Sequence, residues 1–402
     1  MEDNLQDSTY TPKNSAGLLV IRLAFFLLYA SQGVLFSFLV VYYYGKGMTG
    51  TEIGLINTVT PLVGMVTGVF WSYLNDKLGK TRFLIFVAIL GSILSALGIG
   101  AVRPFGLILL LSSTLNFFYR PMVPLLDSSA LVILGNDQGN QYGSIRLFGA
   151  LGYSLAAMAA GYLLTITSIE WLFPSFSLVM LLMAIPIFFL PEQSSPSEQS
   201  SFKDFSSFLK NPVWVMFLAS MTFLWLLEVG LFTFLPIHLK QLGGSDSVIG
   251  TMNAVQALAE AAFLFFSPRL LRRFKLEHLL LASIFIYALR ILLYSLIPTA
   301  EWAIPLGLLH SLSFGLYIVC VIVFVERISP EGLKTTGQGL FNAAMLLVHA
   351  VGSALHGRLI DLKGAVWILQ MDFVLGLIAA LLFWFFFVRQ NRLDPNKSFE
   401  ES

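Results

Sequence analysis

Long runs of apolar residues follow one another along the chain, and short polar segments separate them. A run of about 20 apolar residues is long enough for a helix to cross the hydrocarbon core of a bilayer. The runs are continuous and do not alternate between apolar and polar residues, which excludes the strands of a membrane barrel. We therefore predict an all-α membrane protein with twelve transmembrane helices. The predicted spans are residues 17–44, 50–74, 82–102, 104–134, 142–166, 170–190, 213–238, 247–268, 277–297, 302–327, 336–360 and 366–388.

The composition indicates the same class of protein. Of the 402 residues, 56% are hydrophobic and only 12% are charged, whereas about 25% of the residues in a soluble domain are charged. The formal net charge of +1 argues against a surface that binds nucleic acid. No nucleophile–base motif, phosphate-binding loop or metal-ligand spacing stands out. We therefore predict no enzymatic activity, no metal site and no cofactor.

Basic residues outside the spans are distributed unequally between the two sides of the membrane. Alternate connections place 15 of these Lys and Arg residues on one side and 5 on the other. Because basic residues accumulate on the cytoplasmic side, we predict cytoplasmic termini and a location in the cell (inner or plasma) membrane. The predicted organisation is a tail at 1–16, a six-helix bundle at 17–190, a cytoplasmic linker at 191–212, a second bundle at 213–388 and a tail at 389–402.

The two predicted bundles have related sequences. The segment MTGTEIGLINTV at 48–59 aligns with GGSDSVIGTMNAV at 243–255, and the alignment places Asn57 opposite Asn253. Both segments open the second span of their bundle. Two similar halves with a binding site at their interface are the arrangement of a secondary transporter.

An acid and an arginine lie at the facing ends of two consecutive spans. Asp127 comes near the end of the fourth span, and Arg146 comes near the start of the fifth, after a short polar turn. Helices joined in this way are antiparallel neighbours, so we expect the two side chains to meet. A charge inside a bilayer costs roughly 2.5–3.5 kcal/mol and by default indicates a functional site. The alternative is an ion pair that only locks the two helices together.

Other polar side chains share one face of their predicted helices, as residues that line a cavity do. In the first half, the candidates for the solute site are Tyr29, Gln32, Asn116 and Arg120. In the second half, the candidates for proton coupling are Glu228, Glu260, Arg290 and His310. For the aromatic members of these faces, ordinary packing between helices is the alternative.

Arg120 and Asp127 share a face of the fourth span but are two turns apart, roughly 10 Å along an ideal helix. We expect no direct contact between these two side chains unless Pro121 and Pro124 distort the helix. His356 falls near the outer end of the eleventh span, where we expect it to be solvated. Asp372 falls near the start of the twelfth span, and we expect it to lie too close to the membrane surface to carry a proton.

At this point the sequence resembles the major facilitator superfamily. The segment Asp76-Lys77-Leu78-Gly79-Lys80-Thr81-Arg82, after the second span, is similar to that family's acidic-basic-glycine-basic loop. The resemblance implies a cytoplasmic gate, in which Asp76 caps a helix or pairs across helices, Gly79 permits the turn and Lys80 supplies a basic position. A positive loop with no such role is the alternative.

A narrower resemblance lies in the fifth span. The segment YGSIRLFGALGY at 142–153 is similar to lactose permease and its relatives, which implies that Asp127 and Arg146 bind polar groups of the substrate and that Tyr153 stacks on it. PLLD at 124–127 and LLHSLSFGLY at 308–317 resemble the phenylpropionate permease group more closely.

The same family has an arginine and a histidine that Arg290 and His310 match, but Ser313 replaces the carboxylate that follows the histidine by one turn. Glu260 therefore becomes the predicted proton carrier, because it shares a face with other polar residues, and Glu228 is the next candidate.

We expect a monomeric, proton-coupled symporter of a small organic solute, of the sugar, nucleoside or aromatic acid class, that works by alternating access. Its partners are the solute and the lipid bilayer, and the proton is the coupling ion. The alternatives are a proton-driven exporter or a uniporter of the same fold, or a receptor or scaffold that transports nothing.

Overall fold

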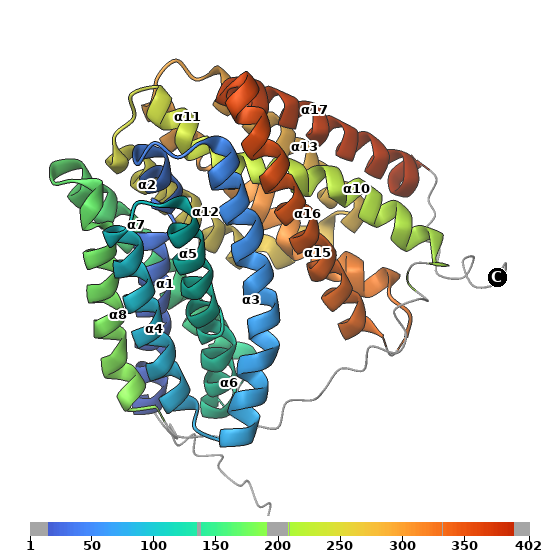
Figure 1. The fold of residues 1–402 in the computed structure, drawn as a ribbon. Helices are drawn as coiled ribbons and strands as arrows, with labels where there is room; N and C mark the ends of the chain where they lie inside the picture. The colour runs from blue at the N-terminus through green and yellow to red at the C-terminus, as the bar shows by residue number, and fades with distance from the viewer. Residues whose placement is uncertain (1–14, 135–137, 191–207, 209, 332, 390–402) are drawn as a thin grey trace, which may run out of the picture.

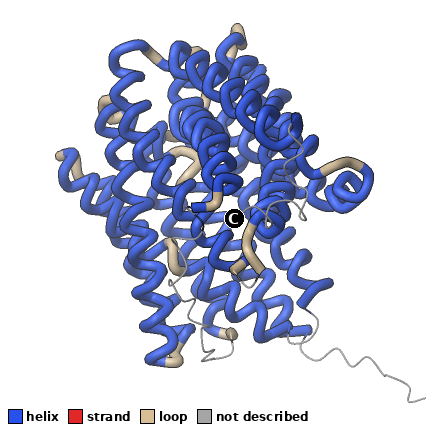
Figure 2. Tube along the Cα trace, turned by 90° about the vertical axis from the view of Figure 1, so that its right-hand side faces the viewer, coloured by secondary structure: helices blue, strands red, loops and turns tan. Residues whose placement is uncertain are grey.

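The computed structural model describes residues 15–134, 138–190, 208, 210–331 and 333–389. These residues form helices joined by short connections, and none of them is in a strand (Figure 2). Twelve helical segments are long and apolar enough to cross a membrane. The prediction of an all-α membrane protein with twelve spans is therefore confirmed.

The first six spans form one bundle, in which the first and fourth spans are each interrupted. The break in the fourth span falls at Arg120 and Pro121. Proline lacks the N–H that would continue the helical hydrogen bonds. The helices are α1 (Ser15–Leu35), α2 (Leu39–Gly45), α3 (Gly50–Leu78), α4 (Thr81–Ala101), α5 (Phe105–Tyr119), α6 (Met122–Leu134), α7 (Gln138–Ile166) and α8 (Leu172–Phe188), with a 3₁₀ turn at η2 (Ile169–Trp171).

The second six spans form the other bundle, and three of them contain a π-helical turn. Such turns are rare and often occur near functional sites. The elements are α10 (Pro212–Val229), η4 (Gly230–Phe234), α11 (Leu235–Gln241), α12 (Asp246–Arg273), α13 (Leu276–Leu296), η5 (Ala300–Trp302), α14 (Ala303–Leu306), η6 (Ser311–Gly315), α15 (Leu316–Ile328), α16 (Lys334–Lys363), α17 (Ala365–Phe383) and η7 (Trp384–Arg389). The turns η4, η6 and η7 are π-helical.

The two bundles meet mainly along two pairs of helices, α3 with α16 and α7 with α12, and α2 also touches α11. Small residues allow this contact, because a Cβ atom on Gly54 would fall on the backbone carbonyl of Ser353, and one on Gly161 would crowd the backbone at Gly250. Close approach of backbones at small residues is the usual way in which membrane helices associate. We call this contact the seam.

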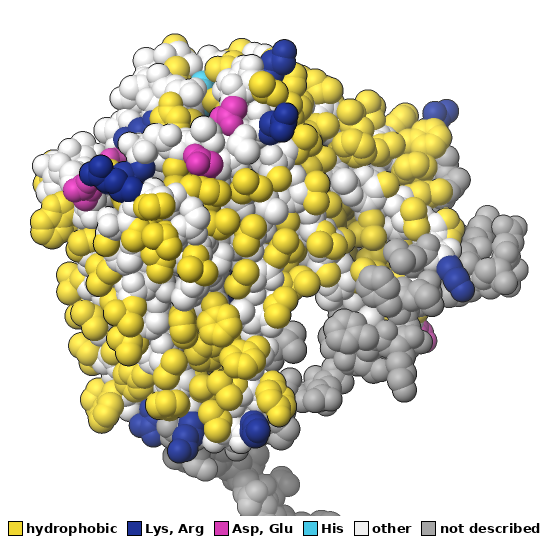
Figure 3. All heavy atoms as spheres, viewed as in Figure 1, with side chains coloured by type: hydrophobic (Ala, Val, Ile, Leu, Met, Phe, Trp, Pro, Cys, Tyr) yellow, Lys and Arg dark blue, Asp and Glu magenta, His cyan; other side chains and the backbone are white. Residues whose placement is uncertain are grey.

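The seam occupies one end of the molecule only. It joins the start of α3 to the end of α16, and the end of α7 to the start of α12. Toward the other end the bundles diverge (Figure 1). The space-filling view shows a hollow between them on that side (Figure 3). A side chain that faces this hollow is therefore accessible to water from one side of the membrane.

Candidate functional site

Asp127 and Arg146 meet, as their positions in the sequence predict. Arg146 Nη2 lies 3.2 Å from Asp127 Oδ2. Tyr142 Oη donates to Asp127 Oδ1 at 2.7 Å, and Arg146 also donates to the hydroxyls of Tyr142 and Tyr29. The side chains of Arg146 and Asp127 are 42% and 26% exposed. This pair is therefore open to solvent and able to offer donors to a ligand.

Aromatic rings surround the Arg146 guanidinium. It lies 5.7 Å from the centre of the Phe25 ring and 5.4 Å from that of Tyr142. Rings at this distance attract a cation through their negative faces and hold the guanidinium in place. Sequence reasoning missed both residues, although Tyr142 lies one helical turn before Arg146 and so shares its face of α7.

Two other predicted solute-site residues make contacts elsewhere. The Tyr153 hydroxyl is 3.2 Å from Ser37 Oγ, and Asn116 is buried, with its amide donating to the Ser112 carbonyl at 3.1 Å. Gln32 is partly buried on α1. The structure thus brings only Tyr29 to the Asp127–Arg146 pair, and the roles of Tyr153, Asn116 and Gln32 stay predictions.

Three predicted coupling residues in the second half come together. Glu260 Oε2 lies 3.2 Å from His310 Nε2, and Arg290 Nη1 lies 2.9 Å from His310 Nδ1. A guanidinium can only donate, so Nδ1 accepts from it, and Nε2 carries the hydrogen that is donated to Glu260. Arg290 also donates to Ser313 Oγ at 2.6 Å. Ser313, which replaces the family's carboxylate, thus positions the guanidinium.

This Glu260 cluster has a buried part and an accessible part. Arg290 is only 2% exposed, and the side chain of His310 is 6% exposed, whereas that of Glu260 is 25% exposed. The carboxylate is therefore the member of the cluster that is most accessible to water, while His310 holds it in position and Arg290 in turn holds the imidazole.

Glu228 forms a second acid–imidazole pair, connected to the first. Its Oε1 accepts from the Tyr287 hydroxyl at 2.5 Å, and its Oε2 lies 3.1 Å from His349 Nε2. The Arg290 guanidinium lies over the Tyr287 ring, 5.2 Å from its centre. Polar contacts thus extend across the second bundle from Glu260 to His349. In the sequence, His349 lies on the polar face of the eleventh span. This position is the signal that could have assigned it to the site.

His356 and Asp372 form a buried pair, so the expectation that His356 is solvated is wrong. Both side chains are 0% exposed, and His356 Nε2 lies 2.8 Å from Asp372 Oδ1. Asp372 lies two turns after the start of α17 at Ala365, close to where the predicted span places it, and its carboxylate packs against Gly230 inside the bundle. His356 faces Asp372 across the contact between α16 and α17, not the solvent.

The predicted gate segment forms the expected turn between α3 and α4. Gly79 ends α3 with φ +61° and ψ 24°, a left-handed conformation that favours glycine over other residues. Lys80 precedes the first residue of α4. The side chain of Asp76 lies outside the described part of the structure, so the gating role of this segment stays a prediction.

The seam carries its own polar contacts. Asp361, near the end of α16, accepts from the backbone amides of Gly50 and Thr51 at 2.6 and 2.8 Å and from the Thr51 hydroxyl at 2.6 Å. Thr58 Oγ1 donates to the Ala350 carbonyl at 2.7 Å. A carboxylate at the first amides of α3 is also favoured by the helix dipole. These bonds hold the two bundles together at the closed end.

Comparisons with known proteins identify relatives across nearly the whole chain. The sequence model described as "MFS_1 like family" matches residues 18–371. Maltose permease of Geobacillus stearothermophilus is 28% identical over 327 residues, which cover 81% of this chain and 82% of the permease. The probable 3-phenylpropionic acid transporter of Escherichia coli (strain K12) is 24% identical over 324 residues, which cover 77% of this chain and 82% of that transporter.

Among solved structures, the nucleoside transporter NupG has a TM-score of 0.81 at 16% sequence identity. The match covers 92% of this chain and 98% of NupG. At this level of identity the likeness shows a shared fold. The curated relatives and this fold together confirm the resemblance predicted from the loop after the second span and from the fifth span.

Proposed function

This chain belongs to the MFS_1-like family of the major facilitator superfamily and is a secondary transporter, not an enzyme, and we propose that it carries a small organic solute together with protons. The observation that supports the proposal most strongly is the pair of charged clusters. Asp127–Arg146 lies in the first bundle, and Glu260–His310–Arg290 lies in the second. In each cluster at least one charged group is accessible.

In the first bundle, the Arg146 guanidinium binds polar oxygens of the solute. Three of its five N–H groups have the partners described above, and the other two remain for an acceptor. Asp127 and Tyr142 hold the guanidinium plane in position. Because such donors are already held in place, binding a ligand costs less conformational entropy.

In the second bundle, Glu260 carries the proton. Its exposed carboxylate exchanges a proton with water in the hollow, and the hydrogen bond from His310 Nε2 keeps the carboxylate in place. Protonation removes the negative charge that balances Arg290, which changes the electrostatics of the second bundle. Proton binding and solute binding are thereby linked to the same rocking motion of the two halves.

The hollow opens to the cytoplasm in this conformation. The seam lies at the ends of the helices that the distribution of basic residues assigns to the outside, and the hollow lies on the opposite side. We propose an inward-open monomer in the cell membrane with both termini in the cytoplasm. The halves then separate at the seam to open the site outward.

Uptake into proteoliposomes with an imposed pH gradient tests this function. The panel contains sugars, nucleosides and aromatic acids. We expect one class to accumulate above its external concentration, and a protonophore to abolish that accumulation. Equilibration without accumulation would identify a uniporter, and proton-driven efflux would identify an exporter. No movement of any solute would favour a receptor or scaffold.

A further inference from the structure

We propose that the solute is an organic anion and that Arg120 binds its carboxylate. The inference rests on the proposed function and narrows its substrate class. Arg120 lies at the interruption of the fourth span, between the end of α5 at Tyr119 and the start of α6 at Met122. The whole span runs from Phe105 to Leu134, so Arg120 lies close to the middle of the membrane. Interrupted helices near the midplane are where many secondary transporters bind their substrates.

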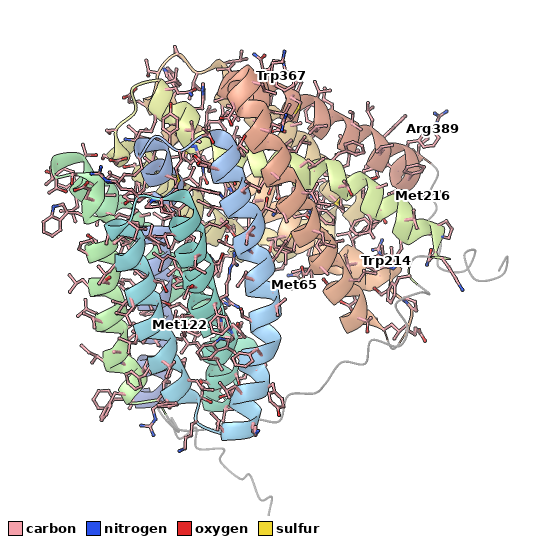
Figure 4. All side chains as sticks on the ribbon, in the orientation of Figure 1. Met65, Met122, Trp214, Met216, Trp367 and Arg389 are labelled. Carbon is pink, nitrogen blue, oxygen red and sulfur yellow. The ribbon has the colours of Figure 1, made fainter. Side chains whose placement is uncertain are left out.

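The Arg120 side chain lies beside α3, one of the two seam helices of the first bundle. Its Cγ would be only 3.1 Å from a Cβ atom on Gly64 of α3, so the absence of a side chain at Gly64 leaves room for it. The next residue, Met65, is labelled on the stretch of α3 that borders the gap between the bundles (Figure 4). Arg120 is an exposed residue. A guanidinium in contact with lipid tails at this depth is strongly unfavourable, so its exposed part faces the hollow.

The part of the chain that the structure describes offers Arg120 no acidic partner. Among the described residues, no carboxylate lies within the 4.0 Å of an ion pair, and its Nε donates a long 3.4 Å hydrogen bond to Asn116 Oδ1. The described carboxylates inside the spans already have partners. These pairs are Asp127 with Arg146, Glu228 with His349, Glu260 with His310 and Asp372 with His356. The cation at the midplane is therefore without a counter-charge.

Two other arginines inside the spans differ from Arg120. Arg290 is buried against His310 and Ser313, so a ligand cannot reach it directly. Arg22 lies two turns from the start of α1 and donates to Ser144 at 2.8 Å, where its long side chain can extend to the membrane surface. Arg146 is exposed but paired with Asp127, so among the described arginines inside the spans Arg120 alone combines depth, exposure and the lack of an acid.

The chemistry of a guanidinium selects the ligand. Its planar donors bind a carboxylate through two parallel hydrogen bonds, which are stronger than bonds between neutral groups. A carboxylate would supply the missing counter-charge, whereas a neutral sugar or nucleoside would leave the cation uncompensated. One unpaired guanidinium matches one carboxylate charge. We therefore assign the substrate to the small organic acids that carry a single carboxylate.

Matched pairs of compounds test the charge requirement on the intact purified transporter. The pairs are 3-phenylpropanoate with 3-phenylpropanamide, D-glucuronate with D-glucose, and orotidine with uridine. We expect at least one acid to raise the unfolding temperature and to accumulate under a pH gradient, and its neutral counterpart to do neither. Tighter binding of a neutral member would overturn the anion assignment, while its proton-driven accumulation would leave the proposed function intact. If no compound binds or moves, both proposals fail.

Two variants test the role of Arg120. We expect Arg120→Gln to weaken binding of the active acid at least tenfold, with Arg120→Lys intermediate. Arg103→Gln, which removes an equal charge from the exposed connection between α4 and α5, should bind normally. Equal affinity of Arg120→Gln and Arg103→Gln would exclude Arg120 as the anchor. If Arg120→Gln does not fold, Arg120→Lys decides the question, since unchanged affinity in that variant argues against bidentate binding.

Discussion

His356 Nε2 lies 2.8 Å from Asp372 Oδ1 in the interior of the second bundle, with both side chains shielded from solvent. His356 Nδ1 donates to the Gly352 carbonyl at 2.9 Å, so the pair shares its proton through Nε2. Burial disfavours any net charge, and a pair that holds one proton is neutral in either arrangement. The pair therefore joins α16, a seam helix, to α17.

We predict that His356→Ala lowers stability by about 3–5 kcal/mol, because it leaves a buried carboxylate without a partner. Asp372→Asn should cost less, since the amide can still donate to His356 Nε2. The unfolding temperature in detergent measures both effects. His278→Ala, at an exposed position on α13, is the control and should behave as the parent protein. Equal stability of His356→Ala and His278→Ala would contradict the structural role of the pair.

The second prediction concerns Asp127 and Arg146. Arg146→Lys should lose solute binding, because lysine cannot reproduce the planar donors that contact Asp127, Tyr142 and Tyr29. Asp127→Asn should also lose binding, because the guanidinium loses its charged partner, while both variants should still fold. Titration of the purified variants with the transported solute measures the affinity. Unchanged affinity in both variants would show that the ion pair only joins α6 to α7 and does not bind the solute.

The third prediction concerns proton coupling. Glu260→Gln should lose accumulation driven by a pH gradient yet keep exchange of solute between the two sides. The amide oxygen can still accept from His310 Nε2, so the fold of the cluster is preserved, but glutamine cannot release a proton. Uphill uptake and counterflow in the same proteoliposomes separate the two activities.

Glu228→Gln is the matched comparison for Glu260→Gln, because Glu228 also pairs with a histidine but is 2% exposed. Its effect on uphill uptake should be milder. Loss of uphill uptake in Glu228→Gln alone would move the proton site to Glu228 and His349.

The fourth prediction concerns the seam. Gly54→Leu should keep it from closing, because the new side chain would meet the Ser353 carbonyl. Spin labels at Gly47 and Lys363, in a Cys320→Ala background, should then report a longer mean distance. Gly68→Leu is the control on the same helix, since nothing lies within 4 Å of its Cβ position. An unchanged distance in Gly54→Leu would show that the seam tolerates the added volume.

The fifth prediction concerns orientation. Cysteines at Ser197 and Ser398, in the predicted cytoplasmic linker and tail, should react with an impermeant thiol reagent only after the cells are permeabilised. A cysteine at Gly47 should react in intact cells, since its connection is assigned to the outside. The opposite pattern would invert the proposed topology and make the hollow face outward.

The spans and the Asp127–Arg146 contact could be predicted because each depends on local information. Continuous apolar runs set the spans, and a short turn between two helices brings the ends of those helices together. The sequence places Tyr142 and His349 on polar helix faces but does not identify their partners, because a tyrosine at the start of a span also suits an interfacial anchor and a histidine has no fixed partner type. The π-helical turn η4 brings Gly230 against Asp372, and this contact depends on tertiary packing.

Burial inside the bundle was the least predictable property. The ends of α16 at Lys363 and of α17 at Ala365 lie within three residues of the predicted span ends. The side chains of His356 and Asp372 are nevertheless fully buried, because they face each other between these two helices. Distance along the sequence from a polar connection therefore underestimates burial where two long helices are joined by a short turn.

The unpaired charge of Arg120 makes the empty transporter sensitive to membrane voltage. In the proposed inward-open orientation, the hollow connects the midplane electrically to the cytoplasm while the seam is closed, and most of the voltage falls across the seam. A potential that is negative inside then favours this conformation, by up to about 2.3 kcal/mol per 100 mV for one charge. A bound carboxylate cancels the charge of Arg120, but the proton on Glu260 leaves the charge of Arg290 without its counter-charge. One carboxylate and one proton together add no net charge, so voltage should bias the empty carrier and the loaded carrier equally, and the complete cycle should move no net charge.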